Sequence, residues 1–170
     1  MTNQTRRHPN VINLAEAEAR EIARGTRFGC TTKMLGRTAG GKGIGASWYE
    51  VSPGRTAFPA HWHSANEEAL FVLEGQGTAR IGTQTVAVRA GDWVTFPPGP
   101  EHAHQLVNDG DVPLRYLCFS TLITTEIVGY PDSGKVGVMS LGPGVNAPWL
   151  RALFKSESQI ADYYDGEKTD

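Results

Sequence analysis

Two histidines and a glutamate fall at a spacing that suits a metal site. His61 and His63 are two residues apart, and Glu68 follows at the start of the apolar run 69–73. Alternate side chains of an extended strand project from one face, so we expect both imidazoles to point the same way. Three such donors are costly to bury without partners, and one divalent cation satisfies all of them. The sequence therefore predicts the first part of a metal site.

Two adjacent glutamates are available as the carboxylate of this group. If Glu68 faces the interior of a strand over 68–74, Leu70 and Val72 share its face and Glu67 points away. Because the apolar pair must be buried, alternation along the strand favours Glu68.

Two further histidines follow a Pro-Pro-Gly turn at 97–99. His102 opens the next expected strand, and His104, two residues later, should face the same interior. For His104 we keep two interpretations. It is either a general acid, general base or substrate hydrogen-bond donor beside a bound cation, or a buried histidine that only supports the ligands.

The spacing of these residues resembles the two sequence motifs of the cupin superfamily. The first motif reads Gly54-x6-His61-x-His63-x4-Glu68-x6-Gly75, and the second reads Gly91-x5-Pro97-x-Gly99-x2-His102. The resemblance implies a metal held by His61, His63, Glu68 and His102. It also implies one divalent transition metal as cofactor, namely Zn, Mn, Fe, Ni or Co.

Two departures from the family pattern accompany this resemblance. Six residues separate Gly54 from His61, where five are usual. Leu106 stands four residues after His102, where the family usually has asparagine, and Asn108 comes two residues later. More narrowly, the runs HAHQLVND, YPDSGK and DYYDGE resemble small single-domain bacterial cupins that are labelled sugar phosphate isomerases by analogy.

The elements that must position these residues are mostly short strands. We expect strands at 26–38, 44–51, 57–63, 68–74, 77–81, 84–89, 92–96, 102–107, 113–121 and 125–129, bounded by Gly, Pro and Asn turns. This pattern predicts an antiparallel sandwich or barrel, and the resemblance makes it an all-β jelly-roll (cupin) barrel. Before it, Asn13 and Glu16 form a capping-box pattern that predicts a short helix ending at Gly25.

We therefore divide the chain into three parts. Residues 1–25 are an N-terminal tail with the short helix, residues 26–129 are the cupin barrel, and residues 130–170 are an irregular C-terminal arm. After Tyr130, the arm carries four large aromatic residues, including Tyr163 and Tyr164, and is expected to pack on the barrel or on a partner subunit.

Composition excludes several classes of partner. The 170 residues include 16 basic and 18 acidic side chains without a basic stripe, which argues against nucleic acid. No apolar run approaches the roughly 20 residues that span a bilayer, and the first residues lack the core of a signal peptide. We expect a cytoplasmic protein with reduced cysteines that binds a small molecule and forms a homodimer through outward-facing Phe71 and Leu73.

Three functions are compatible with this reading. The first is a metal-dependent enzyme acting on a small oxygenated substrate, with sugar phosphate isomerisation as the form that the resemblance suggests and His104 moving the proton. The second is an Fe(II)-dependent dioxygenase, and the third is a non-catalytic binding or sensing domain. Recognition of a phosphate is the weak point of the first, because no basic cluster lies near the motifs in sequence.

Overall fold

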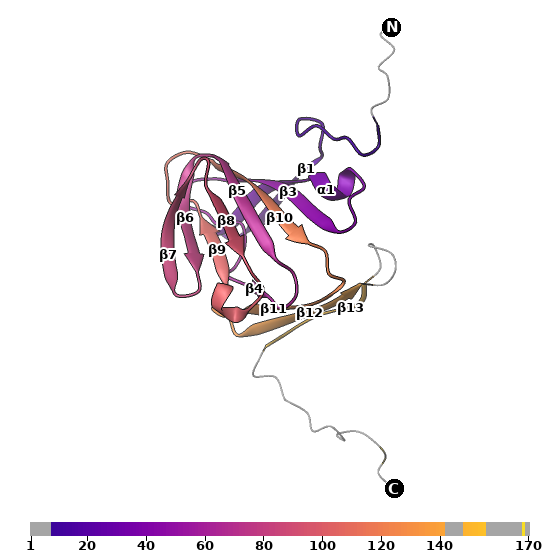
Figure 1. Cartoon of the computed structure of the whole chain (residues 1–170). Helices are drawn as coiled ribbons and strands as arrows, with labels where there is room; N and C mark the ends of the chain where they lie inside the picture. Colours follow the sequence, from indigo (N-terminus) through magenta and orange to yellow (C-terminus); the bar gives the residue numbers. More distant parts are fainter. Residues whose placement is uncertain (1–7, 142–147, 156–167, 169–170) are drawn as a thin grey trace.

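A computed structural model describes residues 8–141, 148–155 and 168 of the chain (Figure 1). Its strands pair antiparallel throughout the three described sheets. The all-β antiparallel jelly roll predicted from the sequence is thereby confirmed.

The largest sheet has the strand order β1-β2-β3-β10-β5-β8. Its members are β1 (Ala19–Arg24), β2 (Phe28–Met34), β3 (Ile44–Val51), β10 (Leu114–Thr121), β5 (Glu68–Glu74) and β8 (Trp93–Phe96). A short helix follows β2, namely α1 (Leu35–Thr38). This sheet presents one wall of the apolar interior.

Two smaller sheets complete the fold. In Figure 1 the strands β6, β7 and β9 lie to the left of the large sheet, and β11, β12 and β13 run below it. The three-stranded sheet consists of β7 (Gln84–Arg89), β6 (Gln76–Ile81) and β9 (His104–Val107). The four-stranded sheet consists of β13 (Pro148–Lys155), β12 (Lys135–Leu141), β11 (Thr125–Tyr130) and β4 (Trp62–His63). The 3-10 turn η1 (Pro100–His102) precedes β9.

The core lies between these sheets and includes one face of β5. Leu70 is 3 % exposed and Val72 is fully buried, while the neighbouring Phe71 and Leu73 are only half-buried. Other core residues pack around them, namely Val51, Phe96 and Leu114 of the same sheet and Leu106 of β9. The apolar run of the sequence thus fixes which face of β5 turns inward, and with it the direction of Glu68.

The Trp62 side chain packs against β11 on the side of β4 opposite the His61 and His63 side chains. Trp62 pairs with Gly129 of β11, and a Cβ atom on that glycine would clash with the indole ring. The bulky ring therefore packs where only a glycine leaves room, and the flanking His61 and His63 turn the other way, toward the interior.

The prediction of an N-terminal helix is wrong. The Asn13 side chain accepts a hydrogen bond from the Ala15 amide, but the turn it caps ends within a few residues. Residues 19–24 instead form β1, which pairs along its whole length with β2 and packs Ile22 against the core. The small apolar residues of this segment offer a helix little to bury, whereas the edge of the sheet satisfies the backbone hydrogen bonds of a strand.

The C-terminal segment is more regular than predicted. Strand β12 pairs with β11 and with β13, so these three strands extend the sheet that carries β4. The predicted aromatic pair Tyr163 and Tyr164 lies outside the described residues. The predicted strand over 57–63 shortens to β4, with His61 joined to β9 by an isolated bridge.

Candidate metal centre

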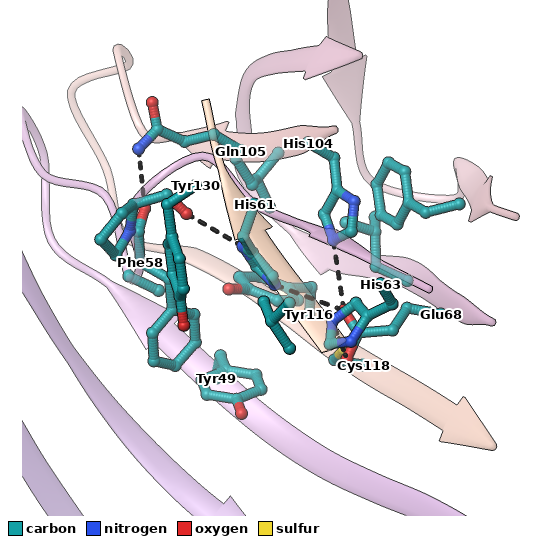
Figure 2. A pocket seen from close by; sticks show the side chains of 16 residues that line it. Tyr49, Phe58, His61, His63, Glu68, His104, Gln105, Tyr116, Cys118 and Tyr130 are labelled. Atoms are coloured by element: carbon teal, nitrogen blue, oxygen red, sulfur yellow. Dashed lines mark hydrogen bonds and ion pairs between the residues drawn. The ribbon is translucent and has the colours of Figure 1, made fainter. Parts of the chain in front are cut away.

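The backbone brings His61 and His104 together from the two sequence motifs. The His61 amide donates to the His104 carbonyl at 3.1 Å, and the His104 amide donates to the His61 carbonyl at 2.8 Å. This reciprocal pair sets the two imidazole rings side by side, with their centroids 4.6 Å apart. Figure 2 shows both rings pointing into the same cavity as His63 and Glu68.

Glu68 lies at the centre of these imidazoles. Its Oε2 atom is 3.2 Å from His104 Nε2 and 3.9 Å from His61 Nε2, and its Oε1 atom is 3.6 Å from His63 Nε2. Ligand atoms of His61, Glu68 and His104 all lie within 4.8 Å of one another. Donors bound to one cation at about 2 Å must lie this close together. Glu67 is exposed, so Glu68 is the glutamate that faces the cluster.

The structure does not bring His102 to this group. His102 belongs to η1, its side chain is 35 % exposed, and its Nε2 atom is 3.7 Å from the neighbouring Glu101 carboxylate. Of the predicted ligands, the structure thus gathers His61, His63 and Glu68, and the fourth member of the cluster is His104.

The position of Asn108 is the sequence signal that indicates His104, and not His102, as the inward-facing histidine of the second motif. The family asparagine usually stands four residues after the motif histidine, and Asn108 stands four residues after His104. Asn108 is completely buried, and its side-chain amide donates to the carbonyl oxygens of Val51 at 2.7 Å and Val112 at 2.8 Å. The turn η1 therefore places the histidine that enters the cavity, His104, two residues later than the motif spacing predicts. The buried Asn108 keeps the family spacing of four residues to this histidine.

Electrostatics keep His61 neutral and Glu68 ionised near neutral pH. Burial, helped by the neighbouring His104, lowers the pKa of His61 to about 4. Burial alone would raise the pKa of Glu68, but the hydrogen bond from His104 and the adjacent imidazoles hold that pKa below its usual value. Neutral imidazole and ionised carboxylate are the forms that coordinate a metal ion.

His63 provides the test of whether a metal fits. Both of its ring nitrogens are buried, and neither has a hydrogen-bond partner among the described residues. Glu126 Oε2 is 3.5 Å from Nδ1 on one side, and Glu68 is on the other. Buried polar atoms without partners are rare, because each loses its hydrogen bonds to water. A cation among the imidazoles and Glu68 would give His63 its missing partner, so the residues fit a divalent transition metal.

The cluster opens into a cavity of about 280 Å³ with mainly apolar and aromatic walls (Figure 2). Tyr49 and Tyr116 stack at 5.2 Å on one wall, and Phe96 stacks on the His104 ring at 3.8 Å. Burial raises the pKa of Tyr49 to about 12, so its hydroxyl stays protonated and can donate. No lysine or arginine is among the described residues that line this cavity.

Comparison with known proteins identifies the class. Residues 47–120 match the family model described as the cupin domain, and this range holds His61, His63, Glu68 and His104. This part of the chain is a cupin domain, as its two motifs predicted.

Three similar proteins extend the comparison. An uncharacterized protein of Methanocaldococcus jannaschii is 37 % identical over 60 residues, which are 35 % of this chain and 46 % of that protein. The match thus spans less than half of the relative. A solved structure from Acidithiobacillus ferrooxidans, named "putative sugar phosphate isomerase", has a TM-score of 0.76 at 22 % identity and covers 91 % of this chain and 97 % of that one.

The third is a cupin-superfamily protein from Silicibacter pomeroyi, named a sugar phosphate isomerase. It has a TM-score of 0.75 at 23 % identity, over 90 % of this chain and 97 % of that one. At these identities the two solved structures share the fold with this chain. In the described residues, no helix has the length and apolar character needed to cross a membrane.

Proposed function

We propose that this cupin binds one divalent transition metal through His61, His63, Glu68 and His104, and acts on a small oxygenated molecule in the adjoining cavity. The observation that carries this proposal is the convergence of four donors at a buried point, where neither ring nitrogen of His63 has a hydrogen-bond partner among the described residues. Motif spacing alone favours His102 as the fourth ligand. The side-chain positions support His104 instead, which changes its expected role from proton transfer to coordination.

The bound metal would polarise a substrate carbonyl or a water molecule. The chain's own residues supply orientation and exclusion of water: the aromatic walls surround the cluster, and Gln105 donates to the Phe58 carbonyl at 2.7 Å at the cavity edge. An isomerase also needs a group that takes a proton from carbon. Glu68 is the ionised carboxylate of the cavity and would be the group that takes this proton.

The apolar cavity supports a second candidate function. Its described lining has no lysine or arginine, which suits an uncharged aromatic or aliphatic substrate. We therefore retain an Fe(II)-dependent dioxygenase as the alternative. Oxygen uptake by anaerobically iron-loaded protein, with and without such compounds, tests it against aldose–ketose interconversion followed by NMR. Tight ligand binding without turnover in either assay would favour the non-catalytic binding domain.

Metal analysis of three histidine variants tests the ligand set. We expect about one divalent ion per chain in the wild-type protein, its loss in His61→Ala and His104→Ala, and its retention in His102→Ala. The last variant is the matched control, because it removes an imidazole two residues from a proposed ligand. Loss of metal in His102→Ala with retention in His104→Ala would overturn the assignment, and a wild-type protein that takes up no metal would overturn the site.

The homodimer through the outward side of β5, with Phe71 and Leu73, remains a proposal as well, and Trp93 lies beside Phe71 on the neighbouring strand β8. Trp93, which is 57 % exposed, stacks on Phe119 at 5.6 Å and forms an apolar feature on the outside of the large sheet. Light scattering of the wild type beside Trp93→Glu tests whether this face joins two chains.

A further inference from the structure

A second hollow, which we call the basic pocket, contains three cationic side chains. Its volume is about 470 Å³, and Arg37, Lys42 and Arg151 line it. They come from α1, from the loop before β3, and from β13, so only the fold brings them together. The Thr124 hydroxyl of the same lining adds a hydrogen-bond donor, whereas those of Ser120 and Thr121 already donate to the Thr121 carbonyl and to Asn66.

The charges of these cations are not used within the described part of the chain. Arg37, Lys42 and Arg151 are all exposed, and no hydrogen bond or ion pair ties their side chains to another described residue. The carboxylate in the lining, Glu126, is 2 % exposed and is already held by three backbone amides. The accessible charge of the basic pocket is therefore positive.

The basic pocket adjoins the candidate metal centre. His63 and Val128 line both this pocket and the central cavity. A smaller hollow of about 170 Å³ shares Arg37 with the basic pocket and shares Glu68 with the central cavity. One extended small molecule can therefore have one end at the metal ligands and the other among the cations.

We propose that the basic pocket binds the phosphate group of a phosphorylated substrate whose oxygenated end lies at the metal centre. This inference rests on the proposed function and specifies its substrate class. A phosphate monoester carries nearly two negative charges and three acceptor oxygens, which match the three cations and the Thr124 hydroxyl. A single carboxylate carries one charge and would leave most of these groups without a partner. The basic pocket thus supplies the phosphate recognition that the cavity beside the metal lacks.

Inorganic phosphate is the probe for this pocket. We expect calorimetry on the metal-loaded protein to show saturable binding of phosphate and at least tenfold weaker binding of acetate. The variant R37Q/K42Q/R151Q should bind phosphate about tenfold more weakly or worse, because charge-assisted hydrogen bonds are lost. The control R20Q/R24Q/R27Q removes the same number of charges from exposed residues on and next to β1, outside the pocket, and should keep wild-type affinity.

Two further measurements separate the possible failures. The metal-free His104→Ala variant should still bind phosphate, which distinguishes the basic pocket from binding on the ion itself. The Lys42→Gln single variant should show an intermediate loss, and circular dichroism checks that the triple variant is folded. Equal phosphate affinity in the wild type and the triple variant, or none in the wild type, would overturn this inference while metal content stays full. Absence of metal from the wild type would instead overturn the proposed function.

Discussion

Glu126 should be essential for the stability of the loop that carries the ligands. Its Oε1 atom accepts hydrogen bonds from the Ser64 amide at 2.9 Å, the Ser64 hydroxyl at 3.0 Å and the Ala65 amide at 3.1 Å. Its Oε2 atom accepts from the Asn66 amide at 2.9 Å and from the Asn66 side chain. One carboxylate thus holds the segment between His63 and Glu68.

The substitution Glu126→Gln removes some of these hydrogen bonds without changing the size of the side chain. The amide oxygen of glutamine can take the place of Oε1 and keep three bonds, but its NH2 group then faces two donors of Asn66. Hydrogen bonds to a charged group contribute about 1.5 to 3 kcal/mol each. We therefore expect the free energy of unfolding at pH 7 to fall by about 3 kcal/mol, from two lost bonds at the lower value.

The difference should depend on pH with a defined sign. Burial opposes ionisation of Glu126, but the hydrogen bonds from Asn66, Ala65 and Ser64 outweigh it and hold its pKa below the usual 4.5. Such a group stabilises the fold fully above 4.5, and its contribution is lost as the pH falls through the lower pKa of the folded state. The difference between wild type and variant should therefore be constant above about pH 5.5 and shrink progressively below 4.5.

Urea denaturation between pH 3 and pH 7 measures this difference directly. Glu67→Gln is the control, because Glu67 is exposed and its change should stay within about 0.5 kcal/mol. The reasoning is refuted if Glu126→Gln loses less than about 1 kcal/mol at pH 7, or if its deficit is the same at pH 3.5 as at pH 7.

Two further substitutions test the frame around the site. Asn108→Ala leaves two buried carbonyl groups without their donor, so we expect a loss of about 2 to 4 kcal/mol in urea denaturation; a loss below 1 would contradict this. Gly75→Ala meets both a backbone φ of 81° and a Cβ position 2.6 Å from the Pro113 carbonyl oxygen, and should lower the melting temperature by several degrees. Gly25→Ala is its control, because φ is 60° there but no atom lies within 4 Å of the Cβ position. An equal fall in melting temperature in both variants would show that φ, and not the contact with Pro113, causes the loss.

The strands around the site could be predicted closely from the sequence. The residues of β3, β5 and β7 have the predicted bounds, because apolar alternation and flanking turn residues agree there. The N-terminal segment could not be predicted, since the capping residues around Asn13 signal a helix while the decisive contact is the distant edge of β2. Local signals fail where a long-range pairing satisfies the same backbone groups better.

In the candidate site, too, local signals predict some positions and not others. The positions of His61, His63 and Glu68 follow from strand alternation, which is local. The choice between His102 and His104 depends on the turn η1, which places the inward-facing histidine two residues later than the motif predicts. The position of Asn108 is the sequence feature that indicates this shift. The basic pocket has no sequence signature, because its three cations meet only in the folded chain.

The paired amide–carbonyl bonds between His61 and His104 have a consequence for how such a site can evolve. These bonds use only main-chain atoms, so they hold the two positions together for any residue except proline. A substitution at either position can change the donor offered to an ion without losing the hydrogen bonds that position it. The proposed metal site can therefore change its donor at either position by a single mutation while the backbone that carries it persists.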